Sequence, residues 1–66
     1  MLAIIVPDIE EVRETAHLLA TGFPLDALRI ADALADDNRD AGDVLRAELW
    51  TQVAILIAEM QRKAIS

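Results

Sequence analysis

Cysteine is absent from this sequence, and its aromatic residues are limited to Phe23 and Trp50. Without cysteine the chain can form neither a disulfide bond nor a zinc site built on thiolates. A chain of 66 residues buries only about 60% of its unfolded surface, and it is marginal without a disulfide, a metal or a partner subunit. We therefore expect a single domain that self-associates.

Positive charge is also scarce. Six basic residues, only one of them lysine, stand against 12 acidic residues, and the net charge is −6. A protein that binds nucleic acid neutralises phosphates with a patch of Lys and Arg, whereas the basic residues here are scattered along the chain. We therefore expect no nucleic-acid partner and no docking on an anionic membrane.

Residues 1–7 form a short apolar arm. The run MLAIIV has six apolar residues and no preceding basic residue, whereas a secretory signal needs a basic start and roughly 7–15 apolar residues and a membrane span needs about 20. The sequence thus predicts a cytoplasmic protein. Ile4 and Ile5 are β-branched and favour a strand or an extended arm. Since an isolated strand is not stable, the arm pairs with its counterpart, lies across a partner's helices or covers its own bundle.

The rest of the chain is rich in apolar residues at helical spacing, which predicts an all-α fold of three helices. The first helix is expected at residues 8–22, with Asp8 and Glu11 capping its start. Gly22 is expected to end it in the left-handed conformation, with Phe23 packing back on the helix. Pro24 suits the first position of a second helix over residues 24–36.

A polar cluster, DDNRDAGD, follows at residues 36–43 and predicts a turn. A third helix is expected over residues 40–64, with Asp40 as its N-cap. Its apolar residues spread over roughly 200°, about twice the stripe that one neighbouring layer covers. Val44 and Ile55 lie outside even this arc, among charged residues.

Two short helices are not expected to cover such an arc, so the sequence predicts an intertwined homo-oligomer, most simply a two-fold dimer. The predicted interface combines the apolar side of the third helix with the N-terminal arm. It comprises Leu49, Trp50, Val53, Leu56, Ile57, Met60, Ile4 and Ile5.

One pattern resembles a metal site. Asp36, Asn38 and Asp40 alternate as in the opening of an EF-hand calcium loop. However, Ala41 stands where that motif has glycine, and Ala47 stands where it has the closing glutamate. These three residues are therefore only weak metal candidates, and we expect no metal and no cofactor.

No catalytic constellation is found. His17 is the only histidine and has neither a nucleophile pairing nor an HExxH spacing. The carboxylates are dispersed, whereas catalytic carboxylates converge in a cleft. The sequence favours a non-enzymatic interaction or regulatory module. Two alternatives stay open: an acidic inhibitor or antitoxin-like protein that binds a basic partner, and a dimer with a small-ligand pocket near Trp50 and His17.

Overall fold

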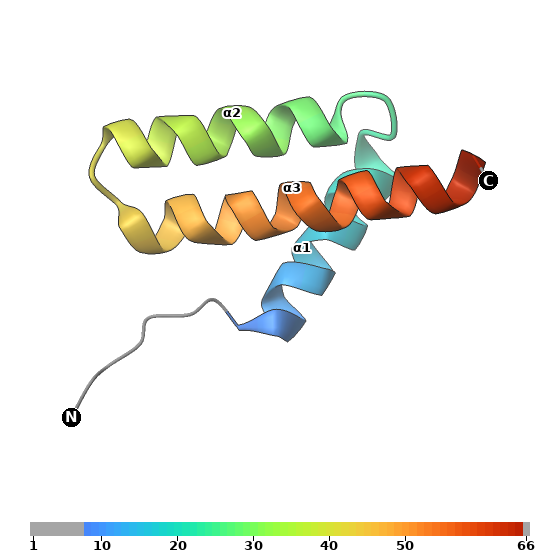
Figure 1. Ribbon diagram of the computed structural model, residues 1–66, viewed down its shortest axis with the longest axis horizontal. Helices are drawn as coiled ribbons and strands as arrows, with labels where there is room; N and C mark the ends of the chain where they lie inside the picture. Colours follow the sequence, from blue (N-terminus) through green and yellow to red (C-terminus); the bar gives the residue numbers. More distant parts are fainter. Residues whose placement is uncertain (1–7, 66) are drawn as a thin grey trace.

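The computed structural model describes residues 8–65, which form three helices (Figure 1). Helix α1 spans Ile9–Gly22, α2 spans Ala27–Asp40 and α3 spans Val44–Ile65. The all-α prediction is confirmed for these residues. The N-terminal arm, with Ile4 and Ile5, lies outside the described residues.

The helices are arranged as a hairpin crossed by a third helix. Helices α2 and α3 lie side by side and antiparallel, and α1 crosses α3 near the end where the α1–α2 connection lies (Figure 1). None of the three helices is both long and apolar enough to cross a lipid bilayer.

Helix α1 has its predicted cap and its predicted end, but Gly22 does not adopt the left-handed conformation that was expected. The Asp8 carboxylate accepts a hydrogen bond from the Glu10 N–H at 3.0 Å and caps the helix. Gly22 is not left-handed, since Gly42 is the only glycine with a positive φ. The Phe23 N–H still donates to the Leu19 carbonyl at 2.8 Å, as within a helix. Pro24, which has no N–H, ends the helix.

Helix α2 is displaced from its predicted position. It spans Ala27–Asp40 rather than residues 24–36. At its start, the Asp26 N–H donates to the Phe23 carbonyl at 3.1 Å, so Pro24 occupies the second position of a β-turn and not the first turn of a helix.

The polar cluster at residues 36–43 is mostly helix and only partly turn. It contains no residue that must break a helix before Gly42, whose φ is 81°. Asn38 donates a side-chain hydrogen bond to the Leu34 carbonyl at 2.7 Å, and Arg39 pairs with Asp36 at 3.1 Å. These local interactions fit a helical backbone, so α2 continues to Asp40.

The N-cap of α3 is Asp43, not Asp40 as predicted. The Asp43 carboxylate accepts from the Arg46 N–H at 3.1 Å. Its other oxygen lies 3.6 Å from the Arg46 guanidinium. The helix therefore begins at Val44, four residues later than expected.

Replacing Asp43 by alanine is expected to lower the free energy of unfolding by about 1 kcal/mol, because α3 loses its cap. Urea unfolding followed by circular dichroism measures this change. Asp40→Ala is the matched control, since Asp40 lies at the negative end of the α2 dipole, where a carboxylate is not favoured. Equal losses in the two variants would contradict the assignment of the cap.

The core is small and consists mostly of alanine. Nine apolar side chains are buried among the described residues, and six of them are alanine: Val12, Ala16, Ala27, Ala31, Ala35, Ala47, Val53, Ala54 and Ile57. Val53 and Ile57 are the largest that are fully buried. Since burying a large aliphatic side chain contributes about 1.5–3 kcal/mol and alanine much less, this core provides little hydrophobic stabilisation.

Candidate interaction surface

The polar side chains of the described residues all lie at or near the surface. None of the polar or charged residues whose burial the structure describes is buried, and all 12 carboxylates of the chain, which lie among them, are exposed or half-buried. Three of them, Asp26, Asp36 and Asp43, form ion pairs with the arginine three residues further along. Such exposed pairs contribute little to stability.

The weak metal candidates lie on a helix rather than in a loop. Asp36, Asn38 and Asp40 belong to the last turns of α2, where Asp36 pairs with Arg39 and Asn38 bonds to the Leu34 carbonyl. An EF-hand needs these positions in a loop that wraps around the ion. Within residues 8–65, no three His, Cys, Asp or Glu side chains are placed to hold a metal together.

The structure divides the predicted interface residues of α3 into two groups. Val53 and Ile57 are 0% exposed and belong to the core of the single chain. The other four are half-buried and pack against that core from its edge: Leu49, Trp50, Leu56 and Met60. Helices α1 and α2 therefore cover more of α3 than its apolar arc suggested.

Trp50 and His17 have different surroundings. Trp50 packs against the core, whereas the His17 side chain on α1 is exposed. The small-ligand pocket was expected between the helices of a dimer, so it stays a prediction.

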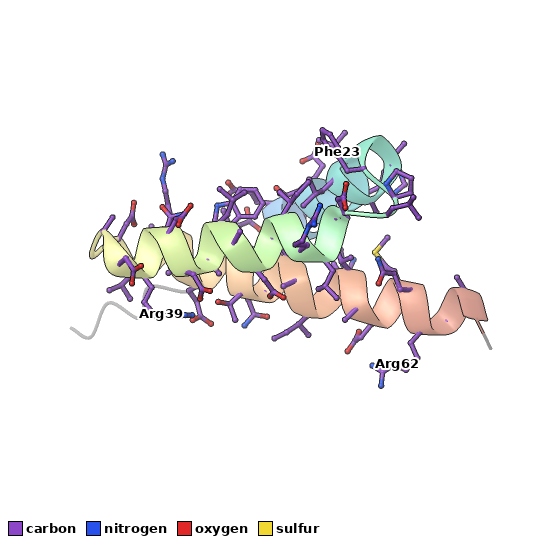
Figure 2. All side chains as sticks on the ribbon, turned by 90° about the horizontal axis from the view of Figure 1, so that it is seen from above. Phe23, Arg39 and Arg62 are labelled. Carbon is purple, nitrogen blue, oxygen red and sulfur yellow. The ribbon has the colours of Figure 1, made fainter. Side chains whose placement is uncertain are left out.

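Large apolar side chains nevertheless remain on the surface. One group, which we call the turn surface, consists of Leu18, Phe23 and Leu25 at the α1–α2 connection. Leu25 is 95% exposed. Figure 2 shows Phe23 on the side of the hairpin where α1 lies. This surface was not predicted from the sequence, because residues 24–36 were expected to form a helix and Phe23 was expected to pack back on the first helix.

A second group lies on α3, on the side that neither α1 nor α2 covers. Val44 is 78% exposed and Ile55 is 51% exposed. Glu48, Ile55 and Arg62 follow one another at seven-residue spacing, so they share one side of the helix. We call the strip formed by Val44, Glu48, Thr51, Ile55, Glu59 and Arg62 the α3 outer face.

The α3 outer face lies opposite the turn surface. In Figure 2, Arg62 and Arg39 project on the side of the hairpin opposite to Phe23. Arg39 reaches from α2 to the Thr51 hydroxyl at 3.4 Å, and Gln52 donates to the Glu48 carboxylate at 3.2 Å. The face therefore carries charges of both signs around one exposed isoleucine.

These two surfaces hold five of the seven large apolar side chains that stay exposed among the described residues. Comparison of the chain with protein-family models, with curated proteins and with solved structures finds no match in any of the three.

Proposed function

We propose that this chain is a non-enzymatic protein-interaction module that acts as a homo-oligomer, most simply a dimer. The observation that carries the proposal is a mismatch between the small side chains of the core and the large apolar side chains left on the surface. The buried core is mostly alanine, whereas seven large apolar side chains stay exposed among the described residues: Ile9, Leu18, Phe23, Leu25, Val44, Leu45 and Ile55.

Self-association would correct this mismatch. A chain of this size has a small core even when it is well packed, and partner subunits are one common source of additional stability. Burying exposed leucine and isoleucine against a second copy contributes roughly 25 cal/mol per Å² of apolar area removed from water. The half-buried residues at the core edge, such as Leu49 and Trp50, are also available to an incoming subunit.

The non-enzymatic part of the proposal is supported by the placement of the titratable groups. General acid–base chemistry uses carboxylates whose pKa is raised in a partly dry cleft. In residues 8–65, the carboxylates are instead dispersed over the surface of all three helices, and His17 is exposed.

An acidic inhibitor of a basic protein is the second candidate, and the outer side of α2 favours it. Asp32, Asp36, Asp37 and Asp40 are all exposed there, with Arg29 and Arg39 as the basic residues of the same helix. Such a surface suits a basic partner, with association that slows as salt is added.

One experiment separates the two candidates. Light scattering at micromolar concentration is expected to give a mass above the 7.2 kDa of one chain. The double variant Asp32→Asn with Asp36→Asn is expected to keep that mass and to lose less than about 0.5 kcal/mol of stability, because both residues are exposed. A wild-type chain that stays at 7.2 kDa would overturn the proposal. Capture of a basic protein by the wild type, lost in the double variant, would establish the inhibitor instead.

A further inference from the structure

The α3 outer face has a charge pattern that is symmetric about Ile55. Glu48 lies seven residues before Ile55 and Arg62 lies seven residues after it. In α3, which spans Val44–Ile65, Ile55 is also at the middle of the helix. Glu48 and Arg62 are exposed on the same side as Ile55, each about 10 Å along the axis from it.

We infer that this face pairs with the same face of a second copy, with the two α3 helices antiparallel and the two-fold axis passing through Ile55. The inference rests on the proposed self-association and specifies its geometry. A two-fold contact uses the same patch on both subunits, so the residue on the axis meets its own copy. Ile55 would then pack on the second Ile55, and each Glu48 would face an Arg62 of the other copy.

The polar residues nearer the axis fit the same pairing. Thr51 lies four residues before Ile55 and Glu59 four residues after it, so they face each other across the axis. Arg39 already reaches the Thr51 hydroxyl from α2. The incoming Glu59 carboxylate would therefore meet an arginine in addition to the hydroxyl.

The charge at the two ends of α3 also selects the antiparallel orientation. The end at the α2–α3 turn is acidic, with Asp40, Asp43 and Glu48, whereas Arg62 and Lys63 lie in the last turns. An antiparallel pair places the basic end of one copy against the acidic end of the other and opposes the two helix dipoles. A parallel pair would place Glu48 beside Glu48 and Arg62 beside Arg62, and such like-charge contacts are strongly unfavourable.

The pairing also buries Ile55, an apolar residue that falls among charges on α3 and that the fold of the single chain leaves exposed. Along the face, the positions from Val44 to Arg62 are spaced by four, three, four, four and three residues, close to the alternation of three and four in a coiled-coil seam. Polar residues in such a seam specify orientation at a cost in affinity.

A charge-swap cycle tests the pairing. Glu48→Arg alone and Arg62→Glu alone are each expected to weaken dimerisation by about tenfold or more, because each places like charges in contact twice per dimer. The double variant restores opposite charges and is expected to recover most of the wild-type affinity. Sedimentation equilibrium of the wild type, the two single variants and the double variant measures the dissociation constant of each dimer.

Cysteine cross-linking tests the axis. The chain has no cysteine of its own, and a disulfide requires Cα atoms within about 7 Å, a spacing expected only near the axis. Ile55→Cys is expected to form a disulfide-linked dimer rapidly with oxidised glutathione. Leu25→Cys is the control, because residue 25 is more exposed but lies on the turn surface.

The outcomes separate this inference from the proposed function. Two results together would overturn the pairing while leaving self-association intact. Ile55→Cys would cross-link no faster than Leu25→Cys, and the double charge swap would not restore the affinity of the dimer. A wild-type chain that is monomeric in sedimentation would overturn both.

Discussion

The Ile57→Asp variant is expected to be unfolded at room temperature. Ile57 is one of the two largest fully buried side chains, and it lies in the cluster that α1, α2 and α3 form together. Truncating a buried isoleucine costs about 2–5 kcal/mol, and burying a carboxylate without a partner costs several more. A small domain has only about 5–15 kcal/mol of stability in total. Far-UV circular dichroism measures the loss of helix.

The matched control is the same substitution two residues earlier. Ile55 is 51% exposed on the α3 outer face, so Ile55→Asp is expected to keep the helix content of the wild type. It is also expected to be monomeric if this face pairs with a second copy. Native helix content in Ile57→Asp would contradict the placement of Ile57 in the core of the single chain.

The periodicity of the sequence was sufficient to predict three helices. In α2, the alanines at four-residue spacing, Ala27, Ala31 and Ala35, are buried, whereas Asp32 and Asp36 are exposed. These predictions succeed because a helix repeats every 3.6 residues, so the side that each residue occupies follows from the sequence once a helix is assumed.

The helix ends were harder to predict, because several residues could end each helix. In the cluster at residues 36–43, only Gly42 adopts a left-handed conformation, and the aspartates before it are accommodated in α2. Both Asp40 and Asp43 are suitable caps in the sequence. The choice of Asp43 depends on where the chain turns, which composition does not specify.

The burial of α3 could not be judged from helix lengths. The expectation was that two short helices cannot cover the whole apolar arc of α3. The single chain buries Val53 and Ile57 fully, whereas the other four predicted residues of the arc stay half-buried: Leu49, Trp50, Leu56 and Met60. The reason is that α1 and α2 approach α3 from different sides, and alanines line the inner side of α2. The distance between packed helices depends on the side chains at the contact, and small ones allow a close approach.

The turn surface and the α3 outer face could be predicted only in part, because both depend on how the three helices pack. Val44 and Ile55 could be recognised in the sequence as apolar residues among charges. That they share a free side of α3 with Glu48 and Arg62, however, depends on where the other two helices lie. The turn surface required knowing that Pro24 and Leu25 are in a turn.

The close contact of α2 with α3 leads to the second large expected effect. Ala31→Leu is expected to lower the free energy of unfolding by about 1–3 kcal/mol, because the added side chain has no space where the helices meet and forces them apart. Ala31 is 0% exposed, and it packs in the same cluster as Val53, Ala54 and Ile57. Urea unfolding of the two chains at equal concentration measures the difference.

Ala33→Leu provides the control, because it is the same change on the same helix. Ala33 is exposed, so a leucine there meets solvent and is expected to change stability by less than about 0.5 kcal/mol. Helix propensity does not distinguish the two variants, since both exchange alanine for leucine within α2. A difference between them therefore reports the packing of α2 on α3. If Ala31→Leu were as stable as Ala33→Leu, α2 could not pack on α3 through its alanines, and the small core described above would be wrong.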